Sequence, residues 1–170
     1  MDRASLTIER LRSLVGYDPE TGVFTRLVAT GVHGIHRAGV EIAKVRKRDG
    51  YLKVCVDSIK YEAGRLAWFY MTGAWPTGDV DHKDGNQQNN RWTNLRDVPH
   101  RTNIENRTRP NKNNRAGLLG VSIHPSKPGF FRAQITVEGR NKSLGTYESA
   151  ELAHAAYVAA KRQFHEGNTL

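Results

Sequence analysis

The segment from Asp79 to Asn94 sets the strongest limit on how this chain can fold. Asp, Asn, Gln and Gly dominate it, and Val80 and Trp92 are its only apolar residues. Such polar residues favour turns, because their side chains bond to the local backbone or because they tolerate left-handed conformations. The composition thus changes abruptly after Pro76, and we predict turn structure rather than a core element over this segment.

The residues before this segment predict a small core of helices and strands. We expect a first helix that Ser5 caps and that a Pro and Gly turn over residues 17–22 ends. A short strand should follow over residues 23–27, whereas residues 30–39 have no clear period and are typical of a loop. The apolar positions of the first helix, at near-helical spacing, are Leu6, Leu11, Leu14 and Val15.

Strict alternation over residues 51–57 predicts a half-buried strand. A turn at residues 58–60 should lead into a second strand, and residues 64–71 are apolar enough for a buried helix that Gly73 and Pro76 end. In the strand, Leu52, Val54 and Val56 alternate with Lys53, Cys55 and Asp57. We expect Cys55 to be an inert, half-buried thiol, and we expect core positions for three aromatic residues, Trp68, Tyr70 and Trp75.

The C-terminal part predicts a three-stranded antiparallel sheet packed on one helix. The strands are expected over residues 118–123, 130–137 and 141–147, and Ser149 should cap a helix over residues 150–165. On the middle strand, Phe131, Ala133 and Ile135 should face the helix, which leaves Arg132, Gln134 and Thr136 on the open face. The helix face expected against the sheet is made of small and apolar residues, namely Leu152, Ala155, Ala156, Ala159 and Phe164.

The charge balance favours a polyanionic partner. Lys and Arg number 26 and Asp and Glu number 17, which gives a formal net charge of +9. Bound cationic side chains release counterions from nucleic acid, although a well-solvated basic surface is the alternative. No apolar run approaches the about 20 residues of a membrane span, so we expect a soluble, cytoplasmic protein. One cysteine excludes an internal disulfide and a multi-thiolate zinc site, so a metal would need His, Asp, Glu or Asn ligands.

Three side chains suit hydrolytic chemistry. His82 stands between carboxylates that could hold one tautomer of a general base for water. Asp81 is a hard oxygen donor suited to Mg²⁺ or Mn²⁺, and the amide oxygen of Asn103 could be a second ligand. The alternative is that these residues are only turn formers with a solvated histidine beside them.

The order and spacing of these residues resemble the HNH, or ββα-metal, endonucleases, and most closely the homing endonucleases of phages and introns. The residues that carry the resemblance are Val80-Asp-His-Lys-Asp-Gly-Asn86, Asn89-Asn90, Asn94-Leu95 and Asn103. Upstream, it extends to Leu14-Val-Gly-Tyr-Asp-Pro-Glu-Thr-Gly-Val-Phe24, Asp49-Gly-Tyr51, Arg65-Leu-Ala-Trp68 and Tyr70-Met-Thr-Gly-Ala-Trp-Pro76. It implies an N-terminal ββα-metal domain over residues 1–107.

The resemblance also implies a role for each residue of the motif. His82 would be the general base, Asp81 and Asn103 would bind one divalent metal, and Asn94 would be the catalytic-site amide that pins the loop between hairpin and helix. Asp84 and Gly85 would shape the hairpin, and Asn90 would clamp the loop. Phosphate contacts could come from Lys83, Arg91 or Arg101. Relatives commonly carry a histidine where this chain has Gly64, and His100 could compensate for its absence.

The C-terminal part resembles the Apetala-two/ERF, or integrase-type, DNA-binding domain over about residues 117–167, which implies a domain over residues 117–170. The matching residues are Gly120-Val121, Gly129-Phe-Phe-Arg-Ala-Gln-Ile135, Leu144-Gly-Thr-Tyr147 and Ala150-Glu-Leu-Ala-His-Ala-Ala-Tyr157. β-sheet readers of this kind lay strands in the major groove. The implied contact positions are Ser122, His124, Arg132, Gln134, Thr136, Asn141 and Ser143. Plant relatives carry Arg or Trp at four of these positions, Ser122, His124, Asn141 and Ser143, so base preference does not transfer.

A basic linker is expected over residues 108–116, and Arg107, Arg109, Lys112 and Arg115 are candidate phosphate contacts. Together these features predict an α+β, site-recognising DNA endonuclease of the HNH homing type with one Mg²⁺ or Mn²⁺ per active site. It would act on double-stranded DNA as a monomer that nicks, with a dimer as the alternative. The other interpretations are a DNA-binding regulator whose catalysis is lost or weak, and an RNA-directed enzyme. The RNA-directed enzyme is less favoured, because a sheet fits the wide major groove of B-form DNA better than the narrow major groove of A-form RNA.

Overall fold

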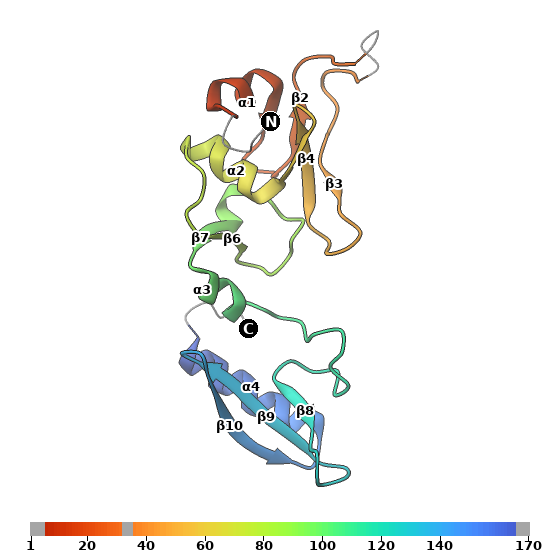
Figure 1. The fold of residues 1–170 in the computed structure, drawn as a ribbon, viewed down its shortest axis with the longest axis vertical. Helices are drawn as coiled ribbons and strands as arrows, with labels where there is room; N and C mark the ends of the chain where they lie inside the picture. Colours follow the sequence, from red (N-terminus) through yellow and green to blue (C-terminus); the bar gives the residue numbers. More distant parts are fainter. Residues whose placement is uncertain (1–5, 32–35, 166–170) are drawn as a thin grey trace. The chain divides into compact units, whose positions relative to one another are not determined.

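The computed structural model describes residues 6–31 and 36–165, and the chain forms two units, Met1–Pro99 and His100–Leu170 (Figure 1). Both units combine helices with small antiparallel sheets, which confirms the mixed α and β class. Within the described ranges, no helix has the length and apolar character needed to cross a membrane.

The first unit is built on three small antiparallel sheets. In the first sheet β1 pairs with β2, in the second β4 lies between β3 and β5, and in the third β6 pairs with β7. Its elements in chain order are α1 (Ile8–Leu14), β1 (Val15–Tyr17), β2 (Phe24–Arg26), β3 (Lys44–Val45), β4 (Leu52–Val56), β5 (Ile59–Glu62), α2 (Ala63–Thr72), β6 (Asp79–His82), the 3₁₀ helix η3 (Trp92–Asn94) and β7 (Leu95–Val98).

The predicted strand over residues 51–57 is β4, and its alternation has the expected effect. Val54 and Val56 are buried, and the turn at Asp57 and Ser58, both with positive φ, leads directly into β5. Cys55 is opposite Lys60 on the other face and is exposed, so the expectation of a half-buried thiol is wrong. Cys55 lies on the face opposite to the buried Val54 and Val56, so the core does not cover it.

The first helix begins later than predicted. Thr7 caps it, because its hydroxyl oxygen accepts a hydrogen bond from the Arg10 backbone N–H, while Ser5 lies outside the described residues. Val15 already belongs to β1. In the region expected to be a loop, Thr30 and His36 form an isolated antiparallel bridge, and residues 32–35 are not described.

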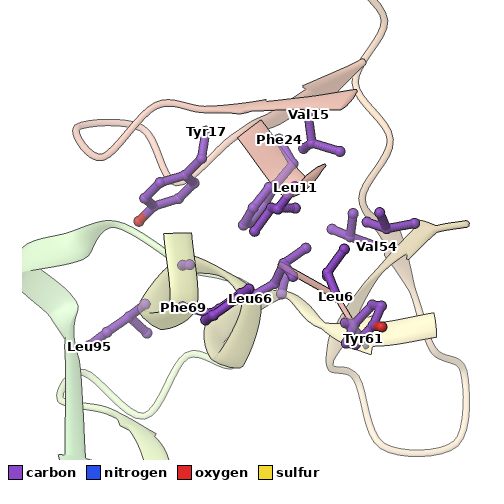
Figure 2. Packing of buried hydrophobic residues seen from close by; sticks show 13 residues of the cluster. Leu6, Leu11, Val15, Tyr17, Phe24, Val54, Tyr61, Leu66, Phe69 and Leu95 are labelled. Atoms are coloured by element: carbon purple, nitrogen blue, oxygen red, sulfur yellow. The ribbon is translucent and has the colours of Figure 1, made fainter. Parts of the chain in front are cut away.

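The core of the first unit gathers side chains from α1, α2 and the sheets around them (Figure 2). Leu11, Phe24 and Leu66 are fully buried there. Trp75 stacks on Phe69 with ring centroids 4.3 Å apart and also on Tyr61. Trp75 and Tyr70 therefore belong to the core as predicted, while Trp68 packs against Trp92.

The segment predicted as turns begins instead with a strand. β6 pairs with β7 in the register Asp79–Val98 to His82–Leu95, and the turn-rich loop occupies only residues 83–91. Polar residues form this strand because tertiary packing buries Asp81 and His82, which local propensity does not reveal. A hairpin was implied only by the family resemblance.

The second unit contains α3 (His100–Glu105) and a sheet in the order β10-β9-β8, with α4 (Ala150–Phe164) along one face (Figure 1). β8 covers Val121–Ile123, shorter than predicted, whereas β9 (Phe131–Val137) and β10 (Arg140–Tyr147) match within a residue. Ser149 caps α4 by accepting from the Leu152 backbone N–H.

The predicted face of α4 is correct only in part, since Ala156 and Phe164 are half-buried and pack on the core of this unit. Ala153, Tyr157, Ala160 and Lys161 are the buried residues of the helix, whereas Leu152 is 57% exposed and Ala155 and Ala159 are also exposed. Alanines surround this helix on all sides, so composition does not select one stripe. The sheet selects it, because the Tyr157 ring packs directly over Gly120.

The basic segment before the sheet is held to the second unit. Lys161, with no exposed surface, donates from Nζ to the Arg107 carbonyl oxygen at 2.6 Å, and burial lowers the pKa of its ammonium group. The Asn114 amide donates to the carbonyl oxygens of Leu118 and Val121. Both ends of the segment expected as a linker are thus tied by hydrogen bonds to this unit.

Candidate active site

The β6–β7 hairpin buries two adjacent ionisable side chains. Asp81 and His82 are each 5% exposed at the end of β6, opposite Arg96 and Leu95. Helix α2 packs against this strand. Burial of polar groups is costly unless they are hydrogen-bonded, so the partners of these two side chains decide what the site can do.

The Nε2 atom of the His82 imidazole has an uncharged hydrogen-bond partner. Nε2 lies 3.1 Å from the amide oxygen Oδ1 of Asn90, which is itself only 1% exposed. The Tyr51 ring lies nearby, with its centroid 6.1 Å from that of the imidazole. An amide oxygen orients the ring without adding a charge to it.

The carboxylate of Asp81 has a cationic partner. Oδ2 of Asp81 accepts from Arg96 Nε at 2.8 Å and lies 2.7 Å from another nitrogen of the same guanidinium. Because the two residues are direct partners across the hairpin, the pairing register brings them together. Arg96 thereby supplies a countercharge to the buried carboxylate.

Asn94 ties together the loop that follows β6. Its amide nitrogen donates to Asp84 Oδ1 and to the Asn89 carbonyl oxygen, while its amide oxygen accepts from the Asp84 backbone N–H. Its own carbonyl oxygen accepts from the Lys83 backbone N–H at 2.9 Å. These contacts tie the loop within the β6–β7 hairpin, whereas the implied pinning of the loop between hairpin and helix and the part of Asn94 in catalysis stay predictions.

Asp84 shapes the same loop. Burial acts to raise the pKa of its carboxyl group, but hydrogen bonds from Asn89, Asn86 and Asn94 outweigh that effect and hold the pKa below its usual value. Asp84 is therefore ionised as it holds the loop, and Gly85 follows it with a φ of +69° that glycine adopts without strain.

The cationic side chains near the motif differ in the contacts that they make within the chain. The Lys83 ammonium donates to the Thr93 carbonyl oxygen, and Arg101 pairs with Glu105 within α3. Arg91 and His100 are exposed. Lys83, Arg91 and Arg101 are all exposed, and a phosphate contact from any of them stays a prediction.

The predicted metal ligands lie in different units of the chain. Asp81 is in the first unit, and Asn103 lies half-buried on α3 in the second, so their joint role stays a prediction. Among residues 6–31 and 36–165, no three His, Cys, Asp or Glu side chains form a metal-binding group. A buried hard-oxygen donor such as Asp81 nevertheless fits Mg²⁺, which keeps most of its ligands as water or substrate phosphate.

The open face of the C-terminal sheet gathers most of the predicted DNA contacts. Arg132 on β9 is opposite Ser122 on β8 and Thr146 on β10. Gln134 pairs with Ser143, and Thr136 pairs with Asn141 through a 2.7 Å hydrogen bond. Ala133 and Ile135 point to the other side and are buried, as predicted. His124 follows β8, where its Nδ1 accepts from the Ser126 backbone N–H.

The four basic residues of the segment before the sheet, Arg107, Arg109, Lys112 and Arg115, are exposed. Arg107 donates to the side chain of Asn111. The segment is thus an exposed basic strip attached to the same unit as the sheet.

Sequence reasoning missed two residues of the site, the Arg96 partner of Asp81 and the Asn90 contact with His82. The register of the hairpin places Arg96, and that register depends on a loop of irregular turns. Asn90 was expected only to clamp the loop. A predicted hairpin with Asp81 opposite Arg96 would have indicated the Arg96 contact, while no local sequence pattern indicates the contact between Asn90 and His82.

Comparison with known proteins supports a nuclease. Residues 61–104 match a family model described as HNH endonuclease. These residues include α2, the β6–β7 hairpin and most of α3. The comparisons with curated proteins and with solved structures gave no significant match. An HNH nuclease domain acts on nucleic acid, and such nucleases generally use a divalent metal.

Proposed function

We propose that this protein is a site-recognising, metal-dependent DNA endonuclease of the HNH homing type. One observation carries the proposal: an adjacent Asp81 and His82, both buried and hydrogen-bonded, lie on a hairpin inside the segment that matches the HNH endonuclease family. Buried, oriented pairs of this kind are costly to fold and concentrate at functional sites.

In this proposal His82 is the general base. It takes a proton from the water that attacks the phosphodiester phosphorus, and general-base catalysis typically contributes 10²–10⁴-fold in rate. Asp81 and Asn103 are the proposed ligands of one Mg²⁺ or Mn²⁺. When bound, such a cation neutralises charge on the phosphoryl group and the leaving oxygen. Arg96 holds the Asp81 carboxylate in place on the hairpin.

The second unit is the proposed reader of double-stranded DNA. Its sheet presents Arg132, Gln134 and Thr136 in alternation on one face, a spacing suited to base edges in a major groove. Arginine can bond guanine or phosphate, and glutamine suits adenine. The exposed basic residues before the sheet would add phosphate contacts that position the domain.

A second candidate function is a DNA-binding protein with weak or absent catalysis. The ion pair between Arg96 and Asp81 favours it, because a metal would have to share or displace that guanidinium. For the first candidate, the nuclease, we propose that a monomer nicks one strand, because each chain has a single active site. Tight DNA binding in EDTA with no metal-stimulated cleavage would select the second candidate.

The test is cleavage of DNA that flanks the protein's own gene, with Mg²⁺ or Mn²⁺ and with EDTA as the control. Strand-resolved mapping should show metal-dependent cuts at a defined position on one strand. Failure of the wild-type protein to cut any such DNA under both metals would overturn the nuclease proposal. Cuts on both strands would overturn only the nicking monomer.

The Asp81–Arg96 pair gives a metal test that needs no cleavage. In Arg96→Met, the Asp81 carboxylate loses this ion pair, and we expect a loss of about 1–3 kcal/mol of stability without metal. Mg²⁺ should then raise the thermal midpoint of this variant more than that of the wild type. The matched control is Arg10→Met, which removes the exposed ion pair with Asp57. An equal Mg²⁺ response in both variants would contradict the assignment of Asp81.

Arg132→Ala should weaken DNA binding about 5–150-fold at fixed salt, because a bidentate arginine contact to a base contributes about 1–3 kcal/mol. Arg140→Ala is the matched control. Arg140 pairs with Val137, which follows Thr136 on β9 and therefore points to the other face of the sheet. Because paired residues share a face, Arg140 lies on the face opposite to Arg132 and Thr136. Fluorescence anisotropy with a labelled duplex measures both. Equal losses in the two variants would show that net charge, and not the open face, decides binding.

A further inference from the structure

The structure assigns a positioning role to Asn90. We infer that its amide oxygen holds His82 in the tautomer with the proton on Nε2, and that Gly64 leaves the space in which this contact forms. The inference rests on the proposed function only in its consequence for cleavage. The contact itself can be tested in the protein without DNA or metal.

The direction of the hydrogen bond follows from the second contact of the same amide. The Asn90 amide nitrogen donates to the Gln88 carbonyl oxygen at 3.3 Å, which turns Oδ1 toward His82 Nε2 at 3.1 Å. Since Oδ1 can only accept, Nε2 must donate. In the neutral ring the basic lone pair is then on Nδ1, the nitrogen that a general base would use.

Residues from the N-terminal segment of the first unit hold the backbone of Asn90 in place. The Tyr17 hydroxyl donates to the Asn90 carbonyl oxygen at 2.7 Å, and both residues are buried. A Cβ at Gly22 would lie only 2.5 Å from the Asn90 carbonyl carbon, so the turn at residues 18–22 presses on this backbone. The Trp92 N–H also donates to the Pro19 carbonyl oxygen. An N-terminal turn therefore fixes the position of the residue that orients His82.

Gly64 on α2 closes the other side of the contact. A Cβ at this position would lie 3.3 Å from Asn90 Oδ1, 3.3 Å from Val80 Cγ1 and 3.6 Å from His82 Cε1. A Cβ here would be in tight contact with the amide oxygen and with Val80 and in ordinary contact with the imidazole, so a side chain would displace the Asn90 amide by a few tenths of an ångström. Gly64 thus allows α2 and the loop that carries Asn90 to lie close together beside His82.

The test is NMR of the full-length protein with ¹⁵N-labelled histidine, recorded where the imidazole is neutral. Long-range ring correlations distinguish the two tautomers, and the spectrum of His82→Gln identifies the His82 signals. In the wild type we expect the proton on Nε2. In Asn90→Leu, which keeps similar volume but removes the acceptor, the signals should shift toward a mixture of tautomers. Asn113→Ala, at an exposed asparagine of the second unit, is the control and should leave them unchanged.

Gly64→Ala and Tyr17→Phe keep the test decisive if Asn90→Leu fails to fold. Each retains the Asn90 amide but disturbs its position, and each should shift the His82 ring signals in the same direction. A wild-type ring with its proton on Nδ1 would overturn the inference. So would an unchanged tautomer in Asn90→Leu, or in both other variants if that one is unfolded.

Cleavage measurements then separate this inference from the proposed function. If the wild type cuts DNA, Asn90→Leu should lower kcat about 10–100-fold with little change in KM, since His82 remains but is poorly oriented. If the wild type does not cut, the nuclease proposal fails while the tautomer result stands by itself. An unchanged kcat together with a changed tautomer would show that orientation of His82 has no part in the reaction.

Discussion

Replacement of His82 by alanine is expected to lower the DNA cleavage rate about 10²–10⁴-fold, because the proposed general base is lost. DNA affinity should stay within about twofold, since His82 is only 5% exposed and the proposed reading face lies on the C-terminal sheet. Single-turnover cleavage and fluorescence anisotropy measure the two quantities separately.

Two controls make this result specific. His36→Ala replaces an exposed histidine whose hydrogen bonds with Thr30 are made by its backbone, so cleavage should be unchanged. His82→Gln retains most of the buried volume and should lose as much activity as the alanine variant, which separates chemistry from packing. Full cleavage in a folded His82→Ala protein would remove His82 from the reaction and overturn the proposed mechanism.

Gly120→Ala is expected to destabilise the second unit by about 2–5 kcal/mol, the sum of two effects. Gly120 has a φ of +76°, where an L-residue is strained by about 1–2 kcal/mol. A Cβ would also overlap the Tyr157 ring of α4, and overpacking of a core typically costs about 1–3 kcal/mol. Urea unfolding of the full chain, followed by the amide NMR signals of β8, β9 and β10, measures the loss.

Gly117→Ala is the matched control for this prediction. Its φ is +72°, but a Cβ there would meet no atom within 4 Å, so only the backbone strain should appear. The difference between the two variants therefore measures the packing of Tyr157 on the turn before β8. Equal losses would mean that the overlap is relieved by a small shift of α4. DNA binding should fall with stability in Gly120→Ala, because the Gly120 carbonyl oxygen accepts from the Gln134 N–H in the sheet that we propose to read DNA.

Local patterns predicted the elements well where one physical effect dominates. The alternation of β4 places Val54 and Val56 in the core, since a strand has a strict two-residue period. Ser149 caps α4 as expected, because the cap contacts only the first turn of its own helix. Gly73 ends α2 with a φ of +75°, the left-handed conformation that glycine adopts freely.

Prediction failed where a neighbour in space makes the choice. Alanines on every side of α4 gave no reason to select Ala153 and Ala160 over Ala155 and Ala159, and the sheet made that selection. A buried lysine also runs against its usual exposure, but Lys161 reaches the Arg107 carbonyl oxygen from inside the unit. Asp79–His82 became a strand because the hairpin partner and α2 bury it, against the turn preference of its residues.

The sequence by itself determined the chemistry that this protein can offer: an adjacent Asp81 and His82, a run of asparagines after them, and alternating polar residues on the middle C-terminal strand. These depend only on residue type and spacing along the chain. The tertiary structure decided which groups meet. It placed Arg96 on Asp81 through strand register, and it placed the Asn90 amide on His82 because Tyr17, Gly22 and Gly64 approach closely from distant segments. Such contacts depend on packing between elements, and no local pattern encodes them.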